Sequence, residues 1–172
     1  MNGNIYLIGY MGTGKSTVGS VLAKKLSGQK SETEYVDMDT EIEKEQDKAI
    51  SEIFAEQGEE AFRDMETDLL RRLSQRKGVV VSCGGGAPLR DENAGLMKNS
   101  GIVIWLDAKP ETIYARLQGD TTRPLLKNNH TLTHITEMMT ARQPSYERAA
   151  THHIYVDDRN VEELVTTILN II

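Results

Sequence analysis

A glycine-rich segment near the amino end places the tightest limit on how this chain can fold. Residues 9–16 read Gly-Tyr-Met-Gly-Thr-Gly-Lys-Ser, with two glycines separated by four residues and then Lys and Ser. A short apolar run from Ile5 precedes the segment, and apolar residues at helical spacing follow it up to Gly28. Strand, loop and helix are the setting in which this pattern, the P-loop, surrounds phosphate oxygens with backbone N–H groups. The alternative, a glycine-rich turn with a solvated lysine, is disfavoured because pattern and flanks both match.

The loop predicts a nucleotide site. Gly12 and Gly14 let the backbone approach phosphates without a Cβ in the way, and Lys15 is expected to bridge the β- and γ-phosphates. Ser16 is expected to bind magnesium. The predicted nucleotide-binding residues of the loop are Gly12, Thr13, Gly14, Lys15, Ser16 and Thr17.

Strands and helices alternate along the rest of the chain. Helices are predicted to start at Thr40, over 50–73 with a break near Gly58, and over 132–148 with a kink or break at Pro144. Two more are predicted to start at Pro110 and Asn160. Strands are predicted over 5–8, 34–38, 79–81, 102–106 and 154–156. The alternation predicts an α/β fold, with a parallel sheet covered by helices on both faces.

The composition excludes several classes of function. With 172 residues, 38% of them hydrophobic, the chain fits one globular domain over 1–172. Its formal net charge of −6 repels polyanions, so we expect no nucleic acid and no anionic membrane as partner. No apolar run approaches the roughly 18 residues of a membrane span, and the amino end shows no export signal. We therefore expect a cytoplasmic protein.

Cysteine and histidine give no sign of metal or nucleophile chemistry. The single cysteine, Cys83, excludes an intrachain disulfide and a cysteine zinc cluster. We interpret it as a small buried residue that closes a strand. The four histidines fit no metal or triad spacing and are interpreted as structural or solvated: His130, His134, His152 and His153.

Two carboxylates follow the second predicted strand. Asp37 and Asp39 are two residues apart, so on an extended segment both project from one face, at the edge of the sheet where ligands of parallel sheets bind. Two carboxylates beside a polyphosphate would repel it unless one of them supports magnesium binding and the other contacts a substrate hydroxyl. A solvated acidic turn is the alternative.

Several motifs together carry a resemblance to one family, and their order and spacing agree from end to end of the chain. They are the P-loop of form GxMGxGKST, Asp37-Met38-Asp39, Phe62-Arg63, Gly84-Gly85-Gly86, Arg123-Pro124-Leu125-Leu126 and Arg142-Gln143-Pro144-Ser145-Tyr146. The set resembles the shikimate kinases; many NTPases share the P-loop, whereas the joint set is specific. The resemblance implies a P-loop NTPase fold of the nucleoside monophosphate kinase-like type. This is a three-layer sandwich around a five-stranded parallel sheet of strand order 2-3-1-4-5.

The resemblance also implies an activity. A chain of this family transfers the γ-phosphoryl group of ATP to the 3-hydroxyl of shikimate, giving shikimate 3-phosphate and ADP in the chorismate (aromatic amino acid) pathway. One Mg²⁺ ion is the implied cofactor and ATP the co-substrate. ATP and shikimate are thus the expected partners, and we expect a monomer.

Carried over residue by residue, the family pattern implies a substrate-binding region over 33–62 and further acceptor-site residues after it. Asp39 meets the substrate hydroxyls and orients or deprotonates the attacking one, while Asp37 supports magnesium alongside Ser16, mostly through water. Arg63 and Arg142 hold the carboxylate, which suits the planar, always charged guanidinium. The implied substrate-binding residues are Asp39, Arg63, Gly84, Gly85, Gly86 and Arg142.

Two of these assignments have structural alternatives that local sequence leaves open. Arg63 lies beside Asp64 and Glu66, and a helical arginine in such company is often solvated or in a weak ion pair. The glycines at 84–86 either bring the backbone close to a ligand or form a tight turn.

The polar segment 118–130 is predicted to be a mobile lid. Within it, Arg123 resembles the lid arginine of the family, which stabilises charge on the transferred group. Arg116 resembles the arginine that stacks on adenine, and Arg159 another nucleotide contact. The implied catalytic residues are therefore Asp39, Lys15 and Arg123.

Two rivals remain at this stage. One is another kinase of the same architecture, acting on gluconate or a nucleoside monophosphate. The other is a nucleotide-dependent switch without a metabolite substrate, which is disfavoured because the chain has no Asn-Lys-x-Asp guanine-reading motif.

Overall fold

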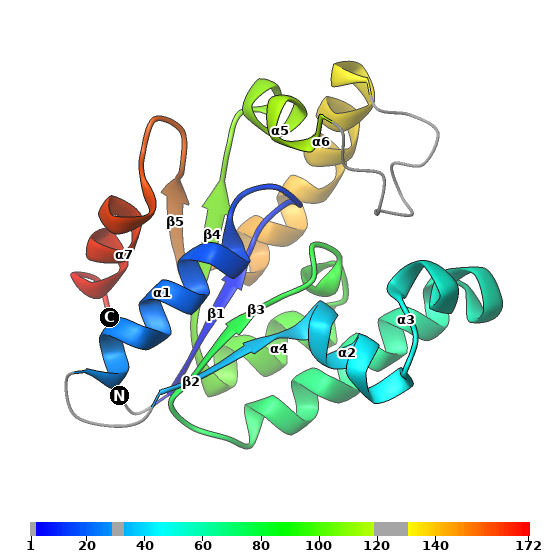
Figure 1. The fold of residues 1–172 in the computed structure, drawn as a ribbon, viewed down its shortest axis with the longest axis horizontal. Coiled ribbons are helices and arrows are strands. Elements are labelled where there is room, and N and C mark those ends of the chain that lie inside the picture. The colour runs from blue at the N-terminus through cyan, green and yellow to red at the C-terminus, as the bar shows by residue number, and fades with distance from the viewer. Residues whose placement is uncertain (1–2, 29–32, 119–130) are drawn as a thin grey trace.

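The computed structural model describes residues 3–28, 33–118 and 131–172, which form a parallel sheet flanked by helices (Figure 1). The sheet has five strands in the order β2-β3-β1-β4-β5, and all four pairings are parallel. The predicted strand order is therefore confirmed. The strands are β1 (Asn4–Ile8), β2 (Glu34–Asp37), β3 (Val79–Ser82), β4 (Gly101–Asp107) and β5 (His152–Tyr155).

Helices connect the strands and cover both faces of the sheet (Figure 1). A short 3-10 turn, η1 (Ala87–Leu89), follows β3. The α-helices are α1 (Lys15–Ser27), α2 (Met38–Gln46), α3 (Ile50–Ser74), α4 (Asp91–Ser100), α5 (Pro110–Leu117), α6 (Leu132–Ala149) and α7 (Val161–Leu169).

Each face of the sheet carries its own hydrophobic core. Successive residues of β1 point to opposite faces. Ile5 and Leu7 pack with side chains of α1 and α7, whereas Tyr6 and Ile8 pack with side chains of α3 and α4. All four residues are 0% exposed, as expected for the central strand of a parallel sheet. The sheet is thus the middle of three layers.

Most predicted breaks and starts are confirmed. Gly58 interrupts α3 with non-helical angles (φ 85°, ψ 170°), and α5 starts at Pro110. Asn160 caps α7 through a capping box, with its Oδ1 accepting from the Glu163 N–H at 3.0 Å. Cys83 is 2% exposed at the end of β3, in agreement with a structural role.

Two local predictions were wrong, and one of the two alternatives predicted at Pro144 is excluded. Helix α2 starts at Met38 rather than Thr40, because the Asp37 carboxylate accepts from the Thr40 N–H (3.3 Å) and so acts as the N-cap. No helix was predicted between the strands at 79–81 and 102–106, where the structure has α4, which buries Asn93, Ala94 and Met97. Helix α6 continues through Pro144, so of the predicted kink or break the break does not occur; the helix has buried residues on both sides of the proline, including Arg142 and Tyr146.

Within the part of the chain that the structure describes, no helix has the length and apolar character to cross a membrane. The same residues contain no group of three or more His, Cys, Asp or Glu side chains that could hold a metal ion. His153 instead stacks on Trp105, with ring centroids 3.9 Å apart, and lies 3.0 Å from Asp107.

Candidate active site

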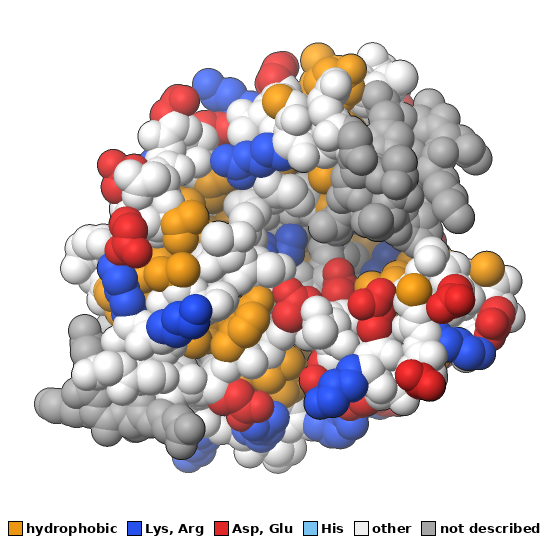
Figure 2. Space-filling model, viewed as in Figure 1, with side chains coloured by type: hydrophobic (Ala, Val, Ile, Leu, Met, Phe, Trp, Pro, Cys, Tyr) orange, Lys and Arg blue, Asp and Glu red, His pale blue; other side chains and the backbone are white. Residues whose placement is uncertain are grey.

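A cavity of about 270 Å³ lies where β1, β2 and β3 end. This is the edge of the sheet at which parallel α/β proteins bind ligands. In the space-filling view the molecule is hollowed near its middle, with basic side chains deep in the hollow and acidic ones on its rim (Figure 2). The cavity is lined by Met11, Gly12, Gly14, Lys15, Ser16, Thr17, Asp37, Asp39, Ser82, Cys83 and Gly85.

The P-loop shapes one wall of this cavity. Gly12 (φ 80°) and Gly14 (φ 90°) take left-handed backbone angles that other residues rarely adopt. Gly14 is also the N-cap of α1, where no side chain accepts a hydrogen bond from the helix. The first N–H groups of an α-helix have no acceptor inside the helix, so this end is suited to anions. The start of α1 at Lys15 therefore has the geometry expected of the predicted phosphate site, whose role stays a prediction.

The Lys15 ammonium group is largely buried, at 9% exposure. Its Nζ donates to the carbonyl oxygens of Gly9 and Tyr10, each at 2.9 Å. Burial of an ammonium ion is costly without such acceptors. Thr13 is buried beneath the loop, where its Oγ1 donates to the same Tyr10 carbonyl at 2.8 Å, and its side chain does not line the cavity.

Ser16 and Asp37 form the polar pair that the sequence assigned to magnesium. The Ser16 hydroxyl donates to Asp37 Oδ2 at 2.6 Å, joining the start of α1 to the end of β2. Both offer the hard oxygen ligands that Mg²⁺ prefers. Mg²⁺ usually keeps several waters and takes one or two protein oxygens plus substrate phosphates, so this pair fits the ion.

Asp39 lies in the first turn of α2 and lines the same cavity. Its carboxylate faces Gly84, because a Cβ on Gly84 would lie 2.9 Å from Asp39 Oδ1 and 2.2 Å from Glu66 Oε1. A side chain at position 84 would thus collide with both carboxylates. The glycine brings the turn after β3 into contact with Asp39.

Arg63 is 7% exposed, so the alternative of a solvated surface arginine is wrong. Its guanidinium donates to Glu66 Oε2 at 2.6 Å and to Glu59 Oε1 at 2.7 Å. A Cβ on Gly86 would lie 2.3 Å from Arg63 Cζ. The glycine run is therefore more than a tight turn: it makes room for the buried charges.

Arg142, on α6, completes the group of buried arginines at 8% exposure. Its Cζ lies 5.6 Å from the centre of the Tyr10 ring, in cation–π range. The neighbouring Tyr146 hydroxyl donates to the Gly85 carbonyl at 2.7 Å. The P-loop, α6 and the glycine run thus meet around this guanidinium.

Glu66 is the site residue that the sequence analysis missed. It is 0% exposed, and its Oε1 has no hydrogen-bond partner within the described residues. Burial raises the pKa of Glu66 to about 7; Arg63 lowers the pKa and the nearby Asp39 charge raises it. The i,i+3 spacing from Arg63 was visible in the sequence, but such a pair is usually a surface ion pair.

The remaining residues that the sequence assigned to the nucleotide are Arg116, Arg159 and Arg123. Arg116 is exposed on α5 and donates to the Gly12 carbonyl at 3.0 Å, so it lies beside the P-loop. Arg159 is exposed on the turn after β5 and is not among the described residues lining the cavity. Arg123 and residues 119–130 of the predicted lid 118–130 lie outside the described residues.

A parallel sheet of this strand order, a P-loop after the central strand and an acidic pair after β2 define a P-loop kinase. The family model for shikimate kinase matches residues 11–172. The chain therefore belongs to the shikimate kinase family, whose members are small-molecule kinases that use ATP as co-substrate and an alcohol group as acceptor.

Individual relatives agree with this membership. The chain is 48% identical over 146 residues to a shikimate kinase of Persephonella marina, covering 85% of each chain. It is 40% identical over 168 residues to one of Symbiobacterium thermophilum, covering 96% of this chain and 94% of the relative. A solved shikimate kinase of Acinetobacter baumannii in complex with shikimate superposes with a TM-score of 0.91 at 36% identity, covering 98% and 92%.

Replacing Gly86 by Ala should weaken acceptor binding, because the new methyl group would displace the Arg63 guanidinium from 2.3 Å away. We expect the acceptor KM to rise at least roughly tenfold, as for the loss of a charged hydrogen bond, with the KM for ATP unchanged. Gly95→Ala is the matched control, since a Cβ there has nothing within 4 Å. An unchanged acceptor KM in Gly86→Ala would contradict the assigned place of Arg63.

Glu66 should make stability depend on pH. Its pKa in the folded protein, about 7, lies above the ordinary carboxyl pKa of 4.5, so the folded state binds the proton more tightly. Stability from this group is present below about pH 4.5 and is lost as pH rises towards 7. Urea unfolding of wild type and Glu66→Gln across this range should give a difference in unfolding free energy that falls with pH and then levels off. A difference that stays flat over this range, or rises near pH 4.5, would show that the carboxyl is ionised throughout and that its pKa is not raised.

Proposed function

We propose that this chain transfers the γ-phosphoryl group of ATP to the 3-hydroxyl of shikimate, giving shikimate 3-phosphate and ADP in the chorismate (aromatic amino acid) pathway. One observation carries the proposal. Asp39 lines a single cavity with Lys15 and faces the same glycine run that packs against the buried Arg63 and Arg142. A phosphate site, an acidic group for a hydroxyl and two cations for a carboxylate thus occur together.

The two buried arginines are the proposed grip on the shikimate carboxylate. A guanidinium stays charged and can bind a carboxylate through two parallel hydrogen bonds. Arg63 is already held by Glu59 and Glu66, and Arg142 lies over the Tyr10 ring, so both are oriented before the substrate arrives. The Gly85 N–H is proposed to donate to the substrate, alongside the adjacent Gly84 and Gly86. Such preorientation reduces the entropy lost on binding.

Asp39 is the proposed partner of the attacking hydroxyl. It is half-buried in the first turn of α2 and lies on the acceptor side of the cavity, next to Gly84. From there it orients the 3-hydroxyl and can accept its proton as the new bond to phosphorus forms. Placing this hydroxyl in line with the γ-phosphorus supplies much of the rate enhancement.

The residues around the P-loop are proposed to stabilise the negative charge that develops on the phosphoryl group during transfer. The backbone of residues 12–17 is proposed to cradle the phosphates, with Lys15 leaving its loop carbonyls to bridge the β- and γ-phosphates. Ser16 and Asp37 would hold one Mg²⁺ ion, Asp37 mostly through water; the ion neutralises phosphate charge. Arg116 and Arg159 are proposed to contact the nucleotide, and Arg123 to stabilise the transferred group from a mobile lid over 118–130.

The wider setting completes the proposal. We assign residues 1–172 to a single kinase domain with a substrate-binding region over 33–62. We also propose that it acts as a cytoplasmic monomer without nucleic acid or membrane partners. The net charge of −6 supports the last point, because it repels polyanions.

An acceptor panel tests the function directly. Purified enzyme with Mg²⁺ and ATP is given shikimate, gluconate or a nucleoside monophosphate, and ADP release is followed together with the phosphorylated product. We expect rapid ADP formation with shikimate alone and recovery of shikimate 3-phosphate. ADP release driven by gluconate or a nucleotide instead would overturn the proposal, and release independent of any acceptor would indicate a nucleotide switch.

Substitution of Asp39 by Asn should separate chemistry from nucleotide binding. Because Asn cannot accept the proton, we expect kcat to fall by about 10²- to 10⁴-fold while ATP affinity changes little. Asp68→Asn is a matched control, since Asp68 is 68% exposed and pairs with Arg71 on the surface. Lys15→Met, by comparison, should lower both turnover and ATP affinity. Normal turnover in Asp39→Asn would rule out the proposed role.

A further inference from the structure

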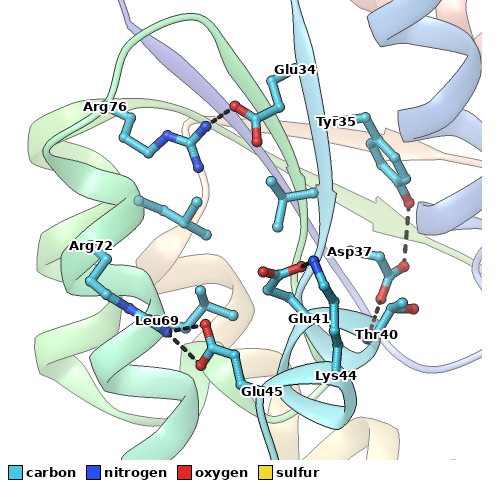
Figure 3. A pocket seen from close by; sticks show the side chains of 12 residues that line it. Glu34, Tyr35, Asp37, Thr40, Glu41, Lys44, Glu45, Leu69, Arg72 and Arg76 are labelled. Carbon is cyan, nitrogen blue, oxygen red and sulfur yellow. Dashed lines mark hydrogen bonds and ion pairs between the residues drawn. The ribbon is translucent and has the colours of Figure 1, made fainter.

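The Ser16–Asp37 pair has a neighbour that its proposed magnesium role does not use. Tyr35 lies on β2, two residues before Asp37, and its hydroxyl points at the Asp37 carboxylate (Figure 3). The distances are 3.1 Å to the Ser16 carbonyl oxygen and 3.3 Å to Asp37 Oδ2. The single hydroxyl proton is thus shared between an acceptor on α1 and an acceptor at the end of β2.

The Tyr35 ring is fixed by packing rather than free to swing. A Cβ on Gly19 would lie 2.8 Å from Tyr35 Cε2, so the ring lies directly on the backbone of α1. Tyr35 is half-buried and packs against the core on this face of the sheet. The ring therefore sets the distance between α1 and β2 at the point where Ser16 and Asp37 face each other.

Each oxygen of the Asp37 carboxylate has a donor. Oδ1 accepts from the Thr40 N–H as the cap of α2, and Oδ2 accepts from Ser16 (2.6 Å) and Tyr35. Ser16 is the proposed metal ligand, so its oxygen must serve the ion as well. Tyr35 is then the side-chain donor that holds Oδ2 without itself being a ligand.

A second cavity, of about 500 Å³, lies on the other side of this arrangement (Figure 3). Tyr35 and Asp37 line it together with basic residues of α2, of α3 and of the segment after α3. Those basic groups bond to carboxylates of the same wall: Arg72 to Glu45 at 2.7 Å, and Arg76 to Glu34. The donors drawn on Asp37 in this view are the Tyr35 hydroxyl and the Thr40 N–H.

From these contacts we infer that Tyr35 is a positioning residue for the divalent cation. Its hydroxyl fixes the position of Asp37 Oδ2 relative to the first turn of α1. The Ser16 and Asp37 oxygens are thereby oriented to bind Mg²⁺ before the nucleotide binds. The inference rests on the proposed magnesium role of those two residues. Groups that orient metal ligands in this way commonly change metal affinity by about 10- to 100-fold when removed.

Tyr35→Phe tests the inference, because it removes the hydroxyl and keeps the ring that packs on Gly19. Mn²⁺ is used as the probe, and its binding to the enzyme–ADP complex is measured by electron paramagnetic resonance without any acceptor. We expect Mn²⁺ affinity to fall by about tenfold. The Mg²⁺ concentration for half-maximal activity should rise in parallel, while kcat at saturating Mg²⁺, metal-free ADP affinity and the thermal midpoint stay near wild type.

Two further variants make the result decisive. Tyr155→Phe is the matched control, since Tyr155 is 60% exposed on β5 and should bind Mn²⁺–ADP as wild type does. Asp37→Asn tests the metal role itself and should weaken Mn²⁺ binding more than Tyr35→Phe. If Tyr35→Phe binds Mn²⁺ as tightly as wild type while Asp37→Asn binds it more weakly, the inferred role of Tyr35 is wrong and the assigned metal site still stands. Unchanged affinity in both would overturn the assigned metal site, independently of which acceptor the enzyme uses.

Discussion

The start of helix α1 is the constraint on which the rest of the site depends. It begins at Lys15 directly behind the central strand, and its N-cap Gly14 offers no side chain to the first N–H groups. A helix end of this kind attracts anions but has to be kept open. In the parallel sheet β1, β2 and β3 end at the same edge. Asp37 at the end of β2 and Asp39 in the first turn of α2 therefore line the same cavity as the start of α1.

The acceptor side has a different physical basis, namely charge that is buried and paired. Arg63 and Arg142 are each less than a tenth exposed, and Glu66 is fully buried. Removing such groups from water is costly, and ion pairs and close backbone approach offset only part of that cost. Gly84 and Gly86 permit the approach, since a Cβ at either position would overlap a buried charged side chain. The free energy of unfolding is thus lower than an apolar core at this place would give, and the arginine side chains are held in fixed orientations.

The sequence predicted the fold class, the strand order and most strand positions because glycine, proline and cap residues mark the boundaries locally. Helix α4 was missed because Asp91, Asn93 and Gly95 break its apolar pattern, and only Ala94 and Met97 among its hydrophobic residues are buried. The start of α2 was misplaced because Asp37 serves as a cap while also lining the cavity.

The candidate site could be predicted where motifs carry it, as with Lys15, Ser16 and Asp39, which the structure brings to one cavity. Glu66 and Tyr35 could not. The importance of Glu66 arises from its burial beneath Gly84, and that of Tyr35 from the bare backbone at Gly19. Both contacts join segments that are distant in sequence, so no local pattern shows them.

The resting position of Lys15 has a thermodynamic consequence. Its ammonium group already has two carbonyl acceptors, those of Gly9 and Tyr10, at normal hydrogen-bond length. In the proposed role of Lys15, the arrival of a polyphosphate would therefore exchange one set of oxygen acceptors for another, and would not require the dehydration of a fully hydrated cation. The loop carbonyls accept the hydrogen bonds of Lys15 until the more strongly charged phosphate oxygens would replace them. Most of the desolvation of Lys15 therefore takes place when the chain folds.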